Sequence, residues 1–186
     1  MKLSNIAEIS IGILIFRYKY NSANDSKKIS YSLFSQNMLS DSGIFQTYKP
    51  DMFISTKDLS ASCTKEGDII FGLRKPNQAV YINEDNTNLL VQSYMAIIRC
   101  NTSVVLPEYL AFKLNTADIQ NQLFKSVQGG SMIQLLKVSH LRDISIDIPS
   151  IEKQKRLITI LKTGYSEIEL LENIMTEKQK LLKAII

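Results

Sequence analysis

The spacing of hydrophobic residues changes near Pro149. In residues 143–149 isoleucines alternate with polar residues, which is typical of a half-buried strand. After Ser150 the apolar residues recur at helical spacing. Proline suits this boundary, because it cannot donate to a sheet ladder and is awkward inside a helix. The pattern predicts a strand that leads into a long helix, with Ser150 as the N-cap and Glu152 in the first turn, where the helix dipole favours an anion.

The predicted C-terminal helix carries a heptad repeat. Nine positions follow strict 4-3 spacing from Leu157 to Ile185, and seven of the nine are apolar. A helix of about 36 residues is roughly 54 Å long, which is more than a small domain needs to cover one face. Sustained heptads favour a coiled coil, and a helix that lies wholly on its own core is the alternative. The predicted dimer interface consists of Ile168, Leu171, Met175, Leu182 and Ile185.

The charges of this helix fall in three blocks, which are basic, acidic and basic in turn. Two parallel copies would place like charges together, which is unfavourable at flanking positions. An antiparallel pair centred on Met175 instead places Glu167 near Lys183. We therefore hypothesise a two-fold homodimer through residues 164–186.

The pattern of the first 149 residues predicts a globular mixed α/β domain, so the whole chain is expected to be α+β with a long coiled-coil helix at its end. A short helix or strand precedes a turn at Gly12, and short strands and loops fill residues 29–62. One helix is expected over residues 107–127, opened by Pro107. Strands are expected at 66–73, 79–82, 89–100 and 143–149.

Composition limits the class of protein without deciding it. With 186 residues, 45% of them hydrophobic, the chain suits one domain or one domain with an appendage. The net charge of +4 permits an anionic partner without requiring one. Cys63 and Cys100 give no disulfide framework, and with the single His140 they lack metal-ligand spacing, so buried free thiols are expected. No apolar run is long enough to span a membrane, and a cytoplasmic protein is expected.

Motifs that carry catalysis are missing from the sequence. It contains neither G-x-x-x-x-G-K-[ST] nor G-x-G-x-x-G, and no His pair, G-x-S-x-G or Asn-Pro-Pro-Tyr. Pro50-Asp51 resembles the start of a nuclease motif, but no acidic-x-Lys triplet follows it. Asp68 follows a glycine before a strand and is interpreted as a turn residue. We therefore predict no catalytic residue, no metal and no cofactor.

Four segments occur in a characteristic order: "GDIIF", "QSYMAIIR", "LPEYLAFKLN" and "GGSMIQLLKVSHLRDISIDIPSIEKQKRL". Together they resemble one target-recognition domain, with its conserved helix, from the specificity subunit of type I restriction–modification enzymes. The strongest part is "IPSIEKQKRL", which is similar to the family's "PP-x-x-EQ" junction. Here Ser150 stands in place of the second proline, and Lys153 replaces the usual acidic neighbour of Gln154.

This resemblance implies sequence-specific recognition of double-stranded DNA on behalf of a separate methyltransferase (modification) subunit and, in some assemblies, a restriction subunit. Residues 1–149 would be the target-recognition domain, and residues 150–186 a helix for dimerisation and methyltransferase docking. Family members usually carry two domains and two helices, so this chain resembles a half-subunit. A two-fold dimer would require an interrupted palindromic target. The alternative is a coiled-coil adaptor that binds the methyltransferase without recognising DNA.

Two polar segments are candidates for DNA contact. Residues 16–28 interleave cations with tyrosines, which suits a DNA backbone and groove, and residues 73–78 place Arg, Lys, Asn and Gln in one hairpin. Arginine suits guanine, and Asn or Gln suits adenine, as bidentate partners. A solvated basic loop and a charged surface turn are the respective alternatives. The candidates are Arg17, Tyr18, Lys19, Tyr20, Lys27, Lys28, Arg74, Lys75, Asn77 and Gln78, with Tyr48 and Lys49 as weaker ones.

Overall fold

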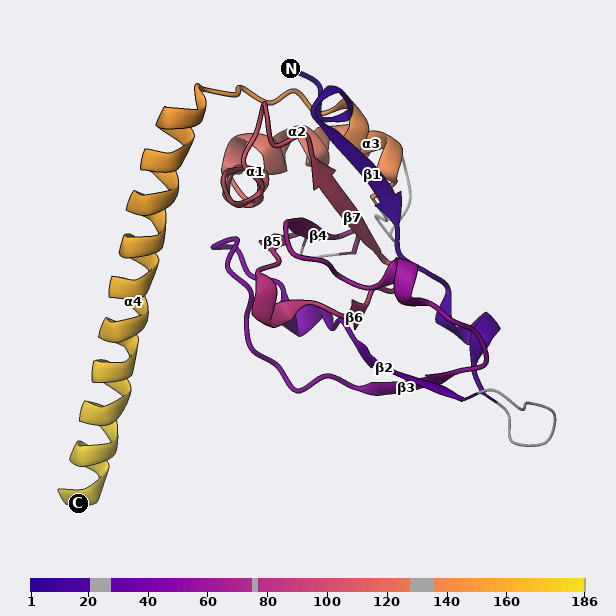
Figure 1. The fold of residues 1–186 in the computed structure, drawn as a ribbon. Coiled ribbons are helices and arrows are strands. Elements are labelled where there is room, and N and C mark those ends of the chain that lie inside the picture. Colours follow the sequence, from indigo (N-terminus) through magenta and orange to yellow (C-terminus); the bar gives the residue numbers. More distant parts are fainter. Residues whose placement is uncertain (21–27, 75–76, 128–135, 186) are drawn as a thin grey trace.

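The structure, a computed structural model, describes residues 1–20, 28–74, 77–127 and 136–185, without the side chains of residues 127 and 185. In these residues two small sheets and three helices form a head, and a long helix leaves it (Figure 1). The fold is α+β, as the sequence predicts. Short 3-10 helices join the elements: η1 (Leu3–Asn5), η2 (Ile15–Tyr18), η3 (Gln36–Met38), η4 (Ser60–Ser62) and η5 (Glu84–Asn86).

The larger sheet is antiparallel, in the order β1 (Ala7–Ile11), β7 (Met95–Cys100), β4 (Asp68–Gly72) and β5 (Ala79–Tyr81). Strand β4 is buried along its whole length. Ile69 and Phe71 belong to the hydrophobic cluster that includes the helices of the head, whereas Ile70 belongs to a second cluster with Phe34 and Met38. The continuous apolar run "IIF" therefore reflects a strand that is covered on both faces.

The smaller sheet has the order β3 (Met52–Ser55), β2 (Ile29–Leu33) and β6 (Leu89–Leu90), with β6 parallel to β2. The prediction of one strand over residues 89–100 is wrong, because the chain turns between Leu90 and Met95 and supplies one strand to each sheet. The backbone N–H of Met95 donates to the carbonyl of Gln92 in this turn. The turn contains neither glycine nor proline, so the sequence does not mark it as a turn.

The predicted helix over residues 107–127 is two helices, α1 (Pro107–Leu114) and α2 (Ala117–Val127). Asn115 separates them. Its side chain accepts from the backbone N–H of Ala79 and donates to the carbonyl of the same residue, both at 2.8 Å, and it also donates to the carbonyl of Ser40. Because β5 is an edge strand, these bonds satisfy backbone groups that have no neighbouring strand.

Residues 143–149 are extended but do not form the predicted strand. Ile144 and Ile146 are buried, so the alternation is correct, yet the segment makes only an isolated bridge between Lys2 and Ser145. The backbone N–H of Ile146 donates to the carbonyl of Met1. A short helix that the sequence analysis missed, α3 (Val138–Asp143), precedes the segment. His140 lies in α3, where its Nδ1 accepts from the backbone N–H of Lys137 at 3.4 Å.

Helix α4 (Ile151–Ile185) confirms the predicted long helix. The Ser150 hydroxyl accepts from the backbone N–H of Lys153 at 3.4 Å, as expected of an N-cap. One turn on, the fully buried Gln154 accepts from the N–H of Leu106 and donates to the carbonyls of Val104 and Pro149. The glutamine of the "IPSIEKQKRL" segment thus joins the start of α4 to the head.

Candidate nucleic-acid interface

The two candidate DNA-contact segments begin beside the same backbone turn, at Gln92–Tyr94. The N–H of Ser93 donates to the carbonyl of Ile13 at 3.0 Å, and the N–H of Leu73 donates to the carbonyl of Tyr94 at 2.9 Å. Residues 14–20 continue from one side of this turn, and the hairpin that begins at Arg74 continues from the other. The tertiary structure therefore brings together the starts of two segments that lie far apart in the sequence.

Close backbone packing at this turn requires glycine at position 12. A Cβ atom there would lie 2.3 Å from the carbonyl oxygen of Gln92 and 2.6 Å from that of Val91. Both are backbone atoms, so the contact could be relieved only by separating the two segments. The sequence predicts a turn at Gly12, and in the structure this glycine permits the close approach of two backbone segments.

The first candidate segment is held on the edge of the smaller sheet. The N–H of Tyr20 donates to the carbonyl of Ile54, and the N–H of Thr56 donates to the carbonyl of Tyr18. Arg17 and Lys19 are exposed. The ammonium groups of Lys57 and Lys28 lie 5.8 Å and 5.9 Å from the ring centres of Tyr18 and Tyr20. Cation–π contacts of this kind hold the two lysines on the same surface as the segment. Lys27 lies outside the described residues.

In the second segment the candidate side chains differ in their freedom. The exposed Arg74 guanidinium lies 5.2 Å from the ring centre of Tyr94. Asn77 is half-buried and donates to the carbonyl of Gly72, so its amide closes the hairpin, while Gln78 is half-buried. Lys75 lies outside the described residues. Arg74 is thus the described side chain of this hairpin that is most open to a ligand.

Tyr94, which the sequence analysis did not select, lies where the segments meet. Burial raises the pKa of its hydroxyl, the charge of Arg74 lowers it, and the charge of Asp51 raises it. Asp51 directly follows the loop that carries the weaker candidates Tyr48 and Lys49, both of which are exposed. The charges of Asp51 and Arg74 therefore act on the same hydroxyl in opposite directions.

The described residues contain no group of three or more His, Cys, Asp and Glu side chains that could hold a metal ion. Cys63 and Cys100 are free; burial raises the pKa of both thiols, that of Cys100 to about 12, so neither is a thiolate near neutral pH. Asp68 is buried and accepts from the Arg99 Nε at 2.8 Å and from the N–H of Lys65 at 3.0 Å. It is both a turn residue and a partner in an ion pair.

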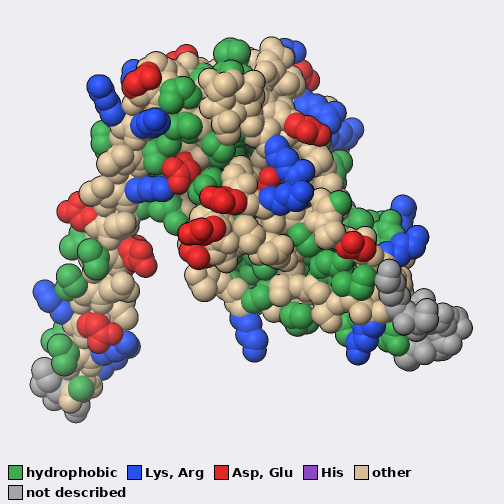
Figure 2. Space-filling model, viewed as in Figure 1, with side chains coloured by type: hydrophobic (Ala, Val, Ile, Leu, Met, Phe, Trp, Pro, Cys, Tyr) green, Lys and Arg blue, Asp and Glu red, His purple; other side chains and the backbone are tan. Residues whose placement is uncertain are grey.

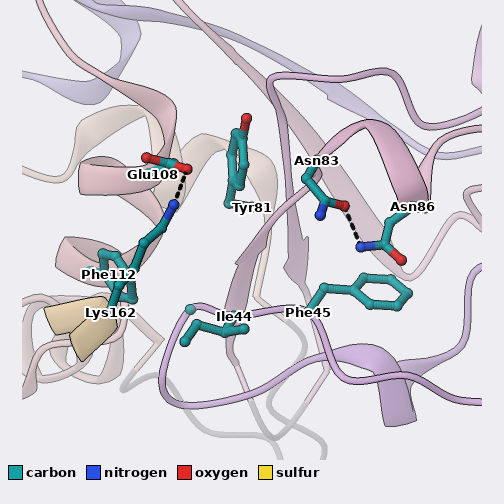
Figure 3. A pocket seen from close by; sticks show the side chains of 9 residues that line it. Ile44, Phe45, Tyr81, Asn83, Asn86, Glu108, Phe112 and Lys162 are labelled. Carbon is teal, nitrogen blue, oxygen red and sulfur yellow. Dashed lines mark hydrogen bonds and ion pairs between the residues drawn. The ribbon is translucent and has the colours of Figure 1, made fainter. Parts of the chain in front are cut away.

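A small pocket lies where α4 meets the head (Figure 3). Its volume of about 160 Å³ is well below the roughly 300–1,000 Å³ of typical ligand pockets, so it does not suit a nucleotide-sized cofactor. On one wall the Lys162 ammonium donates to the Glu108 carboxylate at 2.6 Å. Beyond it the rings of Phe112 and Tyr165 stack at 6.1 Å. These contacts hold the first half of α4 against α1.

The second half of α4 exposes hydrophobic side chains to solvent (Figure 2), and their positions in the sequence form two neighbouring stripes. Ile168, Leu171, Met175 and Leu182, all predicted interface residues, are 51–64% exposed. The side chain of Ile185 lies outside the described residues. A second stripe was not predicted from the sequence. Each of its three residues directly precedes a residue of the first stripe in the sequence, so the second stripe lies about 100° around the helix from the first. It consists of Leu170, Ile174 and Leu181, which are 52–64% exposed.

Within the described part of the chain, no helix has the length and hydropathy needed to cross a bilayer.

The fold and the order of its motifs define a class of protein. Residues 1–179 match the family model described as the type I restriction modification DNA specificity domain. The match extends from residue 1, which precedes β1, well into α4. The chain belongs to this family, in agreement with the resemblance of its motifs.

Known proteins from several bacteria are similar to the chain. The HindI specificity subunit of Haemophilus influenzae is 27% identical over 139 residues, which is 70% of this chain and 30% of that protein. The HsdS subunit from Thermoanaerobacter tengcongensis has a TM-score of 0.69 at 18% identity, over 97% of this chain and 45% of that one. The type I restriction-modification S subunit from M. genitalium has a TM-score of 0.57 at 12% identity, over 97% and 42%. The chain therefore spans less than half the length of these relatives.

Proposed function

We propose that this chain recognises DNA for a type I methyltransferase and has no catalytic activity of its own. Residues 1–149 would be the target-recognition domain, and α4 the element of assembly. The observation that carries the proposal is the family match over residues 1–179, together with a fold that aligns over 97% of the chain with under half of an HsdS subunit. One head and one long helix are what half of such a subunit would contain.

The surface around the Gln92–Tyr94 turn supports DNA contact. Arg74 is exposed beside Tyr94, and Arg17 and Lys19 are exposed on the segment that follows Ile13, where lysines lie over the rings of Tyr18 and Tyr20. Cations at phosphates provide affinity and register, whereas side chains at base edges provide specificity. We assign Arg74 and Gln78 to base recognition, and Lys19, Lys28, Tyr48 and Lys49 to the backbone. Lys27 and Lys75 remain candidates on sequence grounds.

The stripe that contains Ile168 and Leu182 supports a homodimer. An antiparallel pair centred on Met175 would bury both residues and place Glu167 near Lys183. Exposed charge pairs contribute only about 0.2–0.5 kcal/mol each, so the apolar contact would supply most of the affinity. The two identical heads would then lie at opposite ends of the pair and require an interrupted palindromic target.

The second stripe supports a different partner for α4. A two-helix pair that buries Leu171 and Leu182 leaves Leu170 and Leu181 on a neighbouring face. We assign this face to the methyltransferase subunit, because a helix with two apolar stripes can pack against two partners at once. In assemblies that include a restriction subunit, that subunit would join the same complex.

The assembly is tested by mass photometry of the full chain, alone and with the methyltransferase subunit encoded beside it. Ile168→Asp with Leu182→Asp should yield monomers, and Leu170→Asp with Leu181→Asp should keep the dimer but lose the methyltransferase. Asn173→Asp with Thr176→Asp, on the opposite side of α4, is the matched control and should change neither. Wild-type chain that stays monomeric at high concentration would rule out the dimer.

DNA recognition is tested by methylome sequencing and by titration with duplexes at several salt concentrations. The methylated site should be a two-fold interrupted sequence, and log K should fall with log salt at a slope of about −0.9 per phosphate neutralised. Arg74→Ala should relax specificity, whereas Lys19→Ala should weaken binding to all sequences alike. An affinity that does not change with salt would contradict the proposal.

Catalysis is expected only in the presence of partner subunits. The chain alone should neither methylate nor cleave DNA when S-adenosylmethionine or magnesium is supplied, since its sequence lacks the catalytic motifs of both reactions. Turnover in a preparation free of partner subunits would overturn this expectation.

The small net positive charge of residues 1–150 favours one alternative, a coiled-coil adaptor. Residues 1–150 contain 15 Lys and Arg against 13 Asp and Glu, which is a small excess for a DNA-binding domain. A coiled-coil adaptor that occupies the methyltransferase without recognising DNA would have the same α4. The adaptor would be favoured if the chain binds the methyltransferase but the resulting complex methylates no site.

A further inference from the structure

The 3-10 helix η2 exposes a phenylalanine to solvent. Of the described large hydrophobic side chains, Phe16 is the most exposed, at 76%. Residues three apart lie on one face of a 3-10 helix, and here Ile15 and Tyr18 both pack against the cluster that contains Phe53 and Leu90. Phe16 and Arg17 must therefore point away from the head.

Burial in the head does not explain an aromatic residue at position 16. Burial of a phenylalanine stabilises a fold by removing its apolar surface from water, and most of this stabilisation is absent at an exposed position. A polar residue would serve the local turn equally well, because Ile15 and Tyr18 already anchor it. Leu14, two residues earlier, is also 43% exposed. A small apolar projection thus stands at the start of the first candidate DNA-contact segment.

The charges around this projection are mostly positive. The described residues of the surrounding lobe, 13–20, 28–33 and 51–63, contain four cations and two acidic groups. The cations are Arg17, Lys19, Lys28 and Lys57. Figure 2 shows hydrophobic and basic side chains next to one another at this end of the molecule, on the side opposite α4. One acidic residue, Asp58, is bonded to the Tyr31 hydroxyl and the N–H of Ser60.

We propose that Phe16 is a wedge that inserts between two base pairs of the bound duplex. The proposal rests on the DNA-recognition function given above and names the side chain that deforms the DNA. An exposed aromatic ring beside cations matches the two chemistries of DNA, because phosphates attract the cations and only the base stack offers apolar surface to the ring. A protein partner would instead bury the apolar side chains and gain little from Arg17 and Lys19 on the rim.

Insertion would make specificity depend on how easily the DNA is unstacked. Pyrimidine–purine steps unstack and kink most readily, so the wedge should favour a TA or CA/TG step at a fixed position in the target. Arg17 and Lys19 would hold the flanking phosphates while the ring replaces part of the lost stacking. The protein would then select the base pairs at a position of the DNA target that no polar side chain contacts.

The experiment uses the full chain with its methyltransferase and a duplex that this complex selects from a random-sequence library. 2-Aminopurine replaces each adenine in turn, and its fluorescence rises when a base is unstacked. The base that is methylated is excluded, because methyltransferases extrude their target base. Wild-type protein should raise the fluorescence at a second position, next to a pyrimidine–purine step.

Phe16→Ala should abolish this second rise and weaken binding about tenfold, since aromatic–base stacking is lost while the salt slope is unchanged. Phe16→Trp should restore both. Phe124→Ala, at a 48% exposed phenylalanine on α2, is the matched control and should behave as wild type. Arg17→Ala should keep the fluorescence rise and make the salt slope smaller by about one.

The possible failures are distinguishable. If Phe16→Ala binds and unstacks DNA as wild type does, the wedge is wrong and DNA recognition stands. If Phe16→Ala loses the methyltransferase but leaves the fluorescence unchanged, the surface is a protein contact and the wedge is again wrong. If wild-type complex selects no sequence from the library, the proposed function itself fails.

Discussion

The two halves of α4 have the same sequence pattern but opposite environments. In the first half Gln154 and Ile158 are buried, and Leu157, Leu161 and Tyr165 pack against the head. From residue 166 to residue 184 every side chain is exposed, including the apolar ones of both stripes. The heptad does not change where the exposure changes. Heptad spacing therefore indicates that a face will be covered, but it does not indicate by what.

The difference also decides which interpretation of the helix is correct. The alternative that α4 lies wholly on its own core is wrong, because it leaves the head at about its middle (Figure 1). The first half is part of the folded head, and its energetics are those of a domain core. The second half contributes little to the fold, so substitutions there should act on assembly.

The largest effect is expected from Gln154→Leu. The substitution keeps a similar volume but leaves the N–H of Leu106 and the carbonyls of Val104 and Pro149 without the buried amide that binds them. Buried groups without partners cost about 1–3 kcal/mol each, so the free energy of unfolding should fall by about 3 kcal/mol or more. Urea denaturation measures it. Lys155→Leu, an exposed neighbour, is the control, and equal midpoints for both variants would contradict the role of Gln154.

A direct comparison of the two halves uses one residue type. Ile158→Ala should lower the free energy of unfolding by about 2 kcal/mol, because a buried isoleucine loses contacts and leaves a cavity. Ile168→Ala should change it by less than about 0.5 kcal/mol, since the side chain is already in solvent. Denaturation at low protein concentration is required, so that dimerisation does not add to the apparent stability. Equal losses would remove the distinction between the halves.

The boundary between the halves is tested by Tyr165→Leu. The substitution keeps an apolar side chain but removes the stack on Phe112, which should cost about 1 kcal/mol. The direction of α4 should become more variable, because the Lys162–Glu108 ion pair at the surface contributes only about 0.2–1 kcal/mol. Small-angle scattering of the monomeric Ile168→Asp, Leu182→Asp background should then show a broader range of dimensions. An unchanged scattering profile would show that the stack does not set the direction of the helix.

The smallest effect concerns pH at the start of α4. The pKa of Glu152 is lowered from its ordinary value of 4.5, first by its own backbone N–H and then by the Ser150 hydroxyl. A lowered folded-state pKa adds stability above the ordinary value, and this is lost as the pH falls through the lowered value. Glu152→Gln should therefore reduce stability slightly near neutral pH and flatten its decline below about pH 4.5. Parallel pH profiles for the two proteins would contradict this contribution.

Local chemistry made several features predictable from the sequence. Pro149 and Ser150 mark the start of α4 because proline and an N-cap hydroxyl act within one turn of the chain. The Gly67–Asp68 turn before β4 is of the same kind, and Gly67 has a positive φ of 84°. At the candidate interface the exposed cations Arg17, Lys19 and Arg74 were also predictable, because charged side chains seldom leave the surface.

Other features depend on partners that are distant in the sequence. The strand predicted over residues 89–100 is divided because the turn at Tyr94 is bonded to Leu73 and Ile13. The helix predicted over residues 107–127 is divided because Asn115 binds the edge of β5. The exposure of Phe16 was equally hidden, because a phenylalanine in the sequence is more often interpreted as part of a core.

By itself the sequence determined where α4 begins, its heptad and its family, since hydrophobic periodicity, capping and ordered motifs are local properties. Only the tertiary structure decided how the turn at Tyr94 joins the two candidate segments, which half of α4 is covered and where Phe16 points. The physical reason is the same in each case. Burial and exposure depend on which distant segments fill the space beside a residue, and the pattern of one segment carries no record of its neighbours.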